Sequence, residues 1–330
     1  MKADVTTSRV HQWLAARSRW QRRGIAFGAG VLATAAHAPF QLTPLYALAL
    51  VVLVWLLDAA HRRPDRLRAA FGAGLWFGLG HFISGVYWIA SAFLVDAQAW
   101  GPIWGVPAVL ARAGLLALFW AGGAALAMLA WTNDLRRIAV FAAALFFSEW
   151  LRGNLFGGFP WLLPGYVWTP GEPVSQLASL IGVYGLSLLT LVLFAAPAAV
   201  ADASQGPGRR FAPLLVAGLL LGMMWGWGAQ RLANAAIDLP GAQPIVRVAD
   251  SGLSQAEKWQ GRSDQEWRVL NRYLEASGPP EDSRAAVLIW PEGAGRELLH
   301  ARACRVSRRA WPGAWRPGAD RGVDAARAGR

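Results

Sequence analysis

Long apolar segments, separated by short loops, limit what this chain can fold into. Seven can be distinguished, at residues 24–38, 44–60, 69–95, 102–131, 138–151, 176–200 and 211–229. Hydrophobic residues make up 55% of the chain and charged residues only 16%, which is too apolar for an ordinary soluble domain. About 20 apolar residues suffice for a helix to cross a bilayer. The sequence therefore predicts a membrane α-helical bundle of about seven spans over residues 24–230.

The first two segments are short and are separated by a stretch with two prolines, residues 37–44. Prolines with polar residues between them predict a turn, and hence a hairpin of two spans. The first span would cover only about 22 Å of a hydrocarbon core about 30 Å thick. We therefore expect it to begin nearer Trp20 or to thin the bilayer locally. A single broken span is the alternative, but it would put two basic loops on opposite sides of the membrane.

The distribution of Lys and Arg predicts the orientation of the bundle. Residues 1–23 and the loops at 61–68, 132–137 and 201–210 hold six, four, two and two of them. The intervening loops at 39–43, 96–101 and 152–175 hold none, none and one. Because basic loops stay on the cytoplasmic side, we expect residues 1–23 to be a cytoplasmic N-terminus. Residues after about 231 would then lie on the far side, which is the periplasm in a Gram-negative cell.

Small and charged residues inside the segments give two further expectations. Glycines at helical spacing in the third segment should let helices approach closely in lipid; they are Gly72, Gly74, Gly78, Gly80 and Gly85. Arg112 lies well inside the fourth segment and must face protein, water or a headgroup. A side chain that reaches the interface is the simpler interpretation, and a contact with a lipid phosphate is the alternative.

The loop at 153–175 is long, and it combines glycines and prolines with aromatic residues. Glycine and proline argue against a regular helix, and aromatic rings favour the membrane interface. We expect either an interfacial cap on the bundle or a lipid-facing lip beside an active site. The candidate substrate-binding residues of this loop are Phe159, Pro160, Trp161 and Tyr166.

After the last apolar segment the composition changes. Residues 243–249 have the pattern of a strand, residues from Ser263 have the pattern of a capped helix, and residues 286–290 again have that of a strand. Strand, helix and strand at this spacing predict a βαβ unit, the start of an α/β domain. Only about fifty residues are of this kind, too few for a self-sufficient core.

Glu292 follows the second strand directly, after Trp290 and Pro291. Proline ends a strand because it has no N–H to donate. A carboxylate buried at this point would have a raised pKa and could act as a base near neutral pH. A solvated glutamate in a surface turn is the alternative.

Several stretches together resemble the apolipoprotein N-acyltransferase family, over roughly residues 20–294. The matching stretches are Ala36-His37-Ala38-Pro39-Phe40, Gly78-Leu79-Gly80-His81-Phe82 with Tyr87-Trp88-Ile89, Gly158-Phe159-Pro160-Trp161 with Gly165-Tyr166, Ser254-Gln255-Ala256-Glu257-Lys258-Trp259 and Trp290-Pro291-Glu292. The resemblance implies a multi-pass protein of the bacterial inner membrane with a periplasmic nitrilase-like domain, here an incomplete one over 242–294.

The resemblance also implies a reaction. A Cys thiolate takes an acyl chain from a membrane phospholipid, and the amine of a diacylglyceryl-cysteine at the N-terminus of an apolipoprotein then attacks the thioester. Glu292 corresponds to the general base that accepts the thiol proton, and a Lys stabilises the oxyanion. No cofactor and no metal are expected.

The chain departs from the family pattern in its Lys and Cys residues. Its two lysines are Lys2 and Lys258, both before Glu292, whereas the family's catalytic Lys follows the Glu. Its only cysteine, Cys304, comes twelve residues after Glu292, much earlier than the family's nucleophile. Residues 295–330 are an Arg-rich tail without strand periodicity, which suggests a shifted reading frame near Gly295; a genuine disordered tail is the alternative. We expect this polypeptide to be inactive, with most of the catalytic domain lost.

Other classes of protein fit the sequence less well. A membrane transporter or channel with a small soluble cap is the main alternative, but no internal repeat is visible and Arg112 is the only charge well inside a segment. A small-molecule amidase would not need seven spans. The net charge of +12 makes nucleic-acid binding a function to consider. The arginines, however, lie mostly in short loops and form no basic face with interleaved aromatics. We expect no nucleic-acid partner.

Overall fold

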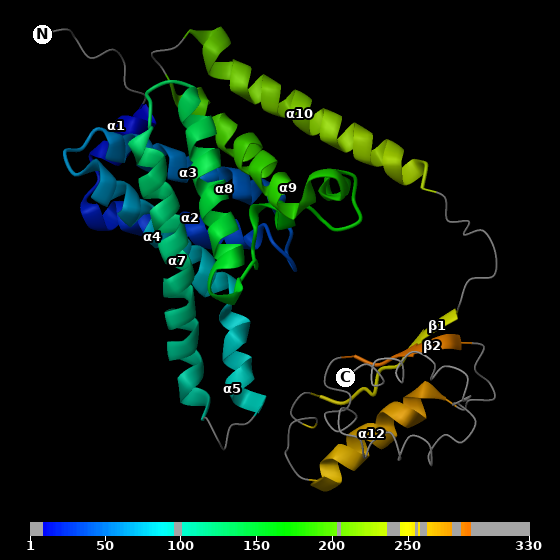
Figure 1. Cartoon of the computed structure of the whole chain (residues 1–330). Coiled ribbons are helices and arrows are strands. Elements are labelled where there is room, and N and C mark those ends of the chain that lie inside the picture. The colour runs from blue at the N-terminus through cyan, green and yellow to red at the C-terminus, as the bar shows by residue number, and fades with distance from the viewer. Residues whose placement is uncertain are drawn as a thin grey trace, which may run out of the picture. The chain divides into compact units, whose positions relative to one another are not determined.

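The computed structural model describes residues 9–95, 101–202, 206–235, 245–254, 257, 263–278 and 285–291. The chain divides into two units, Met1–Ser91 with Ile103–Ala235, and Ala92–Pro102 with Ala236–Arg330. The first unit is helical, and the described part of the second contains two strands and one long helix (Figure 1). We describe each unit by itself.

A helix covers each apolar segment of the first unit, and a short helix, α1 (Arg9–Ala15), precedes them. The longer helices are α2 (Arg19–Ala35), α3 (Thr43–His61), α4 (Arg66–Gly85), α7 (Gly105–Leu129), α8 (Arg136–Asn154), α9 (Ala178–Ala195) and α10 (Pro207–Ala233). Within the described residues, five helices are long and apolar enough to cross a membrane, or six if one bent pair counts as a span. The structure thus confirms a membrane helical region, with fewer clear spans than the predicted seven.

Two segments account for this difference. Helix α2 has only 17 residues and begins with three arginines in its first two turns, although it does extend back past Trp20 as expected. The segment at 69–95 was predicted as one span, and in the structure it is bent rather than one continuous helix. Helix α4 ends at Gly85, and the 3-10 helix η1 (Tyr87–Ser91) and α5 (Ala92–Val95) follow, with a bend of 48°. Glycine has a low helix propensity, so Gly85 is a position at which the helix can end.

The predicted hairpin between the first two segments is present. Ser18 caps α2, because its hydroxyl accepts a hydrogen bond from the Gln21 amide while the Gln21 side chain accepts one from the Ser18 amide. Residues 36–42 form the turn, and α3 then begins with Pro44 in its first turn, where a missing N–H costs nothing.

Helix α4 packs closely against α2 on one side and α7 on the other. A Cβ added at Gly80 would lie 2.1 Å from the Phe27 carbonyl oxygen of α2. A Cβ at Gly74 would lie 2.4 Å from the Trp120 carbonyl oxygen of α7, and one at Gly78 would lie 2.9 Å from Ala117 Cα. These glycines permit the close approach that the sequence predicted. Gly72 differs, since a Cβ there would meet no atom within 4 Å.

A buried ion-pair network joins α1, α3 and α8 to Trp131 and Asp202 at the end of the bundle where α3 finishes. The Asp58 carboxylate lies 3.1 Å from His11 Nε2 of α1, and it accepts a hydrogen bond from Trp131 Nε1 at 3.0 Å. The Arg137 guanidinium lies 3.2 Å from Asp58 and 2.8 Å from Asp202. Arg137 is only 1% exposed. The sequence analysis counted it among the loop arginines, but in the structure it forms buried ion pairs with Asp58 and Asp202.

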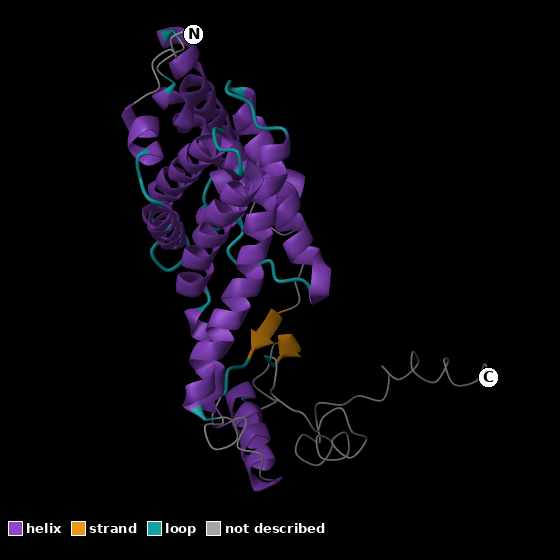
Figure 2. Ribbon diagram, turned by 90° about the vertical axis from the view of Figure 1, so that its left-hand side faces the viewer, coloured by secondary structure: helices purple, strands orange, loops and turns teal. Residues whose placement is uncertain are grey.

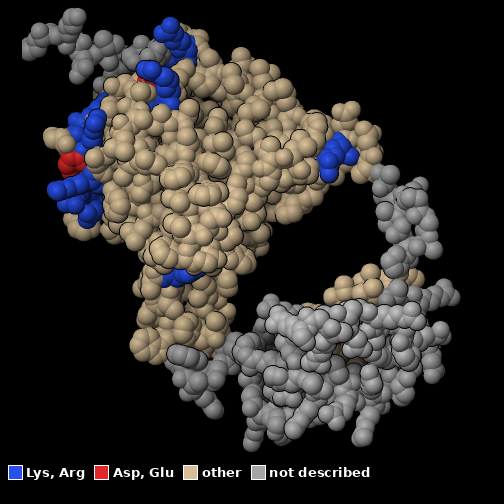
Figure 3. Space-filling view, in the orientation of Figure 1, with Lys and Arg blue, Asp and Glu red and all other residues tan. Residues whose placement is uncertain are grey.

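Helix α3 separates two chemically different ends of the bundle. Near its first residue, the Thr43 hydroxyl donates to the Val167 carbonyl at 2.9 Å. Val167 belongs to the loop at 153–175, which we call the aromatic loop. Its last residue, His61, precedes the arginine-rich turn to α4. Nineteen residues at 1.5 Å each span about 28 Å, close to the thickness of a hydrocarbon core. We call the two the aromatic end and the basic end; Figure 3 shows Lys and Arg gathered at the side of the unit where α2 begins.

The second unit contains the predicted βαβ arrangement. Strands β1 (Ile245–Val248) and β2 (Ala285–Ile289) pair in parallel (Figure 2), and α12 (Ser263–Ser277) connects them in sequence. The side chain of Trp290 donates to Ser277 Oγ at 2.9 Å, and its ring lies 5.6 Å from that of Tyr273. The helix is therefore packed onto the end of the second strand, two residues before Glu292.

The glycines of α2 offer a matched test of this packing. Gly30→Ala would place a Cβ 2.0 Å from the Phe77 carbonyl oxygen of α4, so we expect destabilisation of about 1–3 kcal/mol, the usual cost of overpacking. Gly28→Ala is the control, because a Cβ there meets nothing within 4 Å. Thermal unfolding in detergent should show a lower midpoint for Gly30→Ala alone. Equal midpoints for the two variants would contradict the close α2–α4 contact.

Candidate functional site

The candidate loop residues lie just after α8, at the aromatic end. Phe159, Pro160 and Trp161 follow the 3-10 turn η3 (Leu155–Gly157), and Tyr166 lies on η4 (Pro164–Val167). Trp161 and Tyr166 are 54% and 44% exposed, and Phe159 is half-buried. The loop thus has no regular helix, as predicted, and it presents aromatic rings on its surface. Glu292, Lys258 and Cys304 lie outside the described residues.

A buried ion pair holds the first half of this loop. Arg152, in the last turn of α8, donates two hydrogen bonds to the Glu149 carboxylate, and both side chains are about 1% exposed. The same guanidinium also donates to the Phe159 carbonyl, while the Phe159 amide donates to the Arg152 carbonyl at 3.0 Å. Charge-assisted bonds of this bidentate kind are strong and directional. Arg152 therefore fixes where Phe159 begins the exposed part of the loop.

Gly158 lets the chain reverse directly before Phe159. Its φ is +72°, and a Cβ there would lie 2.3 Å from the Gly153 carbonyl oxygen. Both the left-handed backbone and the close approach require glycine. The loop can therefore return to Arg152 only with glycine at this position.

Side chains from two helices and the hairpin turn hold the second half of the loop. The Gly165 amide donates to Ser187 Oγ of α9 at 2.9 Å, and Trp168 Nε1 donates to Thr190 Oγ1 at 2.8 Å. The Thr169 hydroxyl donates to the Gln41 side chain at 2.8 Å. Together with the Thr43 bond, these contacts make residues 165–169 a fixed part of the bundle.

Two residues from other elements join the exposed aromatic rings. The ring of Trp161 lies 6.1 Å from that of Phe159 and 5.3 Å from that of Trp88 on η1. The Arg112 guanidinium of α7 lies 4.1 Å above the Phe159 ring, within cation–π range. We call Trp88, Phe159, Trp161 and Arg112 the aromatic platform. The sequence singled out Arg112 but could not place it on Phe159, and it did not identify Trp88 as a site residue.

The aromatic platform combines apolar surface with one half-buried cation. An acyl chain can lie against the rings, while a guanidinium can donate to a phosphate or a carbonyl oxygen. Tyr166 takes no part in the ring contacts that join Phe159, Trp161 and Trp88 within the described residues. The structure thus brings together Phe159, Pro160 and Trp161, and it leaves Tyr166 on a separate turn.

Beneath the loop lies a buried group of polar side chains that the sequence did not reveal. The rings of His37, in the hairpin turn, and His81, on α4, are 5.4 Å apart, and Tyr46 stands 5.6 Å from His37. The Thr34 hydroxyl lies 3.0 Å from His81 Nδ1. These histidines are 44 positions apart, so no local spacing could have linked them. No three His, Cys, Asp or Glu side chains among the described residues could hold a metal ion.

A groove of about 520 Å³ opens at the same end, between α10 and residues 168–174. It is lined by Thr43, Trp168, Thr169, Glu172, Pro173, Val174, Gly218, Leu221, Gly222 and Trp225. Below it α10 approaches the loop closely, because a Cβ at Gly228 would lie 1.9 Å from the Pro173 carbonyl oxygen. Apart from Glu172 and two threonines, the lining consists of apolar and aromatic residues.

Comparison with known proteins points to one family over most of the helical unit. A family model described as the apolipoprotein N-acyltransferase N-terminal domain matches residues 29–196. Proteins named apolipoprotein N-acyltransferase from Rhodopseudomonas palustris and Bradyrhizobium diazoefficiens are 38% and 40% identical, each over 83% of this chain and 52% of the relative. One from Brucella melitensis is 37% identical over 86% of this chain and 53% of the relative. The chain spans about half the length of the curated relatives it matches.

Removing Arg152 tests whether the ion pair holds the loop. Arg152→Gln leaves the Glu149 carboxylate buried without its cation, and such a loss typically costs about 3–5 kcal/mol. We expect a lower unfolding midpoint and faster hydrogen exchange in residues 155–163. The double variant Glu149→Gln, Arg152→Gln is the control, since it leaves no unpaired buried charge and should recover part of the stability. Unchanged exchange in Arg152→Gln would show that the ion pair does not position the loop.

Proposed function

The chain belongs to the apolipoprotein N-acyltransferase family, and we propose that it forms the membrane bundle and the first part of the catalytic domain of such an enzyme. The proposed reaction transfers an acyl chain from a membrane phospholipid to the N-terminal amine of diacylglyceryl-cysteine in an apolipoprotein. The family match over residues 29–196, which runs from α2 through α9, carries this proposal. The transporter alternative is not favoured, because the matched proteins are named as acyltransferases.

The membrane bundle has a clear purpose in this reaction. Both proposed substrates carry acyl chains that remain in the bilayer, so the site must lie at the membrane surface. Phe159, Pro160, Trp161 and Tyr166 are the proposed lipid-facing residues, with Trp161 and Tyr166 well exposed. Arg112, stacked on Phe159, could donate to the phosphate or ester oxygens of the acyl donor.

We further propose an orientation in a bacterial inner membrane. The basic end would face the cytoplasm, and the aromatic end and the residues after about 231 would face the periplasm, following the bias of Lys and Arg. Seven crossings then require α2 to span as the short partner of α3, and α4 with its bent continuation to count as one span. Seventeen residues of α2 cover about 25 Å, which a locally thinned bilayer accommodates.

The proposed catalytic domain begins with the βαβ unit of residues 242–294. In a nitrilase-like domain, Glu292 would accept the proton of a Cys thiol. The thiolate would attack the donor's ester carbonyl, the lysophospholipid would leave with a proton, and the acceptor amine would then displace the thiol from the thioester. Neither Lys2, Lys258 nor Cys304 matches the family's catalytic positions. We therefore propose that residues 1–330 by themselves do not complete the reaction, and that residues 295–330 play no part in it.

A chimera tests this proposal. Residues 1–294 would be joined to the remainder of the Bradyrhizobium diazoefficiens relative and assayed for acyl transfer to a diacylglyceryl peptide. We expect turnover by the chimera, a loss of about 10²-fold or more with Glu292→Gln, and none by the 330-residue chain. A folded, membrane-inserted chimera without turnover would contradict the assigned function. Turnover by the 330-residue chain would contradict its inactivity.

A further inference from the structure

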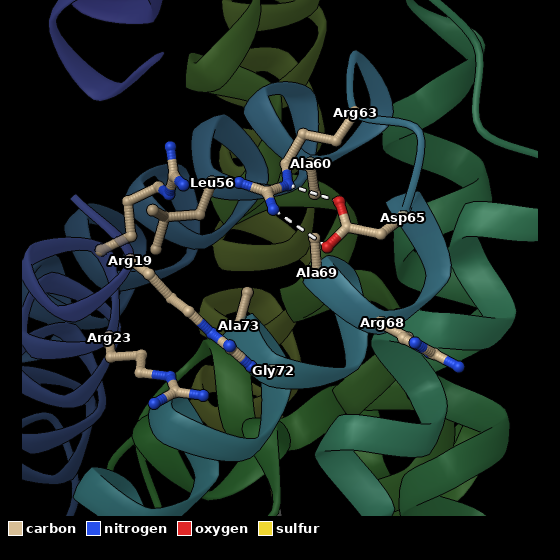
Figure 4. Close-up of a pocket in the computed structure, with 11 residues that line it drawn as sticks. Arg19, Arg23, Leu56, Ala60, Arg63, Asp65, Arg68, Ala69, Gly72 and Ala73 are labelled. Atoms are coloured by element: carbon tan, nitrogen blue, oxygen red, sulfur yellow. Dashed lines mark hydrogen bonds and ion pairs between the residues drawn. The ribbon is translucent and has the colours of Figure 1, made fainter. Parts of the chain in front are cut away.

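A small cavity opens at the basic end of the bundle, about 28 Å along α3 from the aromatic loop. Its volume is about 210 Å³, and α2, α3, α4 and the turn between α3 and α4 form its walls (Figure 4). Its lining residues are Arg19, Arg22, Arg23, Leu56, Ala60, Arg63, Asp65, Arg68, Ala69, Gly72 and Ala73. We call it the arginine pocket.

The charges of the arginine pocket are not balanced. Arg63 donates to both oxygens of Asp65, at 2.8 and 2.9 Å, and this pair holds the pKa of the Asp65 carboxyl below its usual range. The other four guanidinium groups form no ion pair with any residue that the structure describes; they belong to Arg19, Arg22, Arg23 and Arg68. Four such cations around one cavity repel one another, and a bound anion would remove that repulsion.

The rest of the pocket is suited to a lipid rather than to a free ion. Its floor is apolar, formed by Leu56 and Ala60 of α3 and by Ala69, Gly72 and Ala73 of α4. Figure 4 shows the small α4 residues between the arginines of α2 and the Arg63–Asp65 pair. A phosphate can therefore contact the arginines while its glycerol lies against the floor.

Tryptophans place the pocket at the depth of lipid headgroups. The Arg23 guanidinium lies 4.5 Å from the ring of Trp20 and 5.7 Å from that of Trp76. Trp20 is 69% exposed. Indole rings favour the membrane–water interface, so the arginines beside them lie where phosphates of the bilayer are found.

We propose that the arginine pocket binds the phosphate of an anionic phospholipid headgroup, with phosphatidylglycerol or cardiolipin as the chemical class. Basic pockets between membrane helices are suited to such headgroups. Because the pocket lies at the opposite end of α3 from the aromatic platform, this lipid is not the proposed acyl donor. It would tie the start of α2 to the start of α4, and its binding does not depend on acyl transfer.

Native mass spectrometry of the full chain, released from nanodiscs of phosphatidylethanolamine with phosphatidylglycerol, tests the proposal. The variant Arg19→Gln, Arg68→Gln removes two pocket arginines that make no ion pair with a described residue. The control Arg62→Gln, Arg66→Gln removes two exposed arginines close to the turn between α3 and α4. Neither of them lines the pocket. Because contacts between a guanidinium and a phosphate are charge-assisted and directional, we expect the pocket variant to lose bound phosphatidylglycerol by roughly tenfold or more, and the control to keep it. Equal losses would mean diffuse attraction and would overturn the proposal.

Two further measurements separate a lipid from other anions. Gly72→Leu keeps every charge but fills the pocket, because a Cβ at Gly72 meets nothing within 4 Å; Gly28→Leu is its control. We expect Gly72→Leu alone to lose the lipid, and retained lipid would overturn the proposal. Inorganic phosphate at millimolar concentration should neither displace the lipid nor raise the unfolding midpoint as the lipid does. If it does both, the pocket binds a soluble anion and not a lipid.

Discussion

The close approach of α4 to its two neighbours is the constraint on which the helical unit depends. A membrane bundle gains no hydrophobic driving force between its helices, so packing and a few polar contacts must hold it together. Gly74 and Gly78 admit the backbone of α7, and Gly80 admits that of α2. This approach also brings His81 and Ser84 within hydrogen-bonding distance of Thr34 on α2. A side chain at any of these glycines would separate the helices and break those contacts.

Helices α3 and α4 determine where the two ends of the unit lie. At the aromatic end, a Cβ at Gly85 would lie 2.2 Å from the Leu162 side chain, so the loop lies directly on the end of α4. At the basic end, Arg68 and Gly72 line the arginine pocket. At the basic end, Arg137 of α8 pairs with Asp58 of α3. At the aromatic end, Arg152, which pairs with Glu149 within α8, donates to the Phe159 carbonyl and so holds the loop. The proposed lipid-facing surface and the proposed anion-binding pocket are thus held about one bilayer thickness apart.

The sequence predicted the helical segments, the hairpin and the βαβ unit, because each rests on local periodicity or on a turn signal. The sequence analysis failed where contacts between distant segments determine the structure. The break after Gly85 follows a continuous apolar run, and Arg137 looks like any loop arginine until Asp58 and Asp202 are brought to it. The aromatic loop was expected from its composition. The aromatic platform could not be predicted, because Trp88 and Arg112 come from other elements. They contact Trp161 and Phe159 only in the folded bundle.

The central claim is that the basic and aromatic ends lie on opposite sides of a membrane. In a Cys304→Ser background, Arg62→Cys and Trp161→Cys each place one thiol at an exposed position. A membrane-impermeant maleimide would be applied to intact bacterial spheroplasts and to opened ones. The proposed orientation predicts that the thiol of Trp161→Cys reacts in both, and that of Arg62→Cys reacts only in opened spheroplasts. Reaction of both thiols in intact spheroplasts would contradict it.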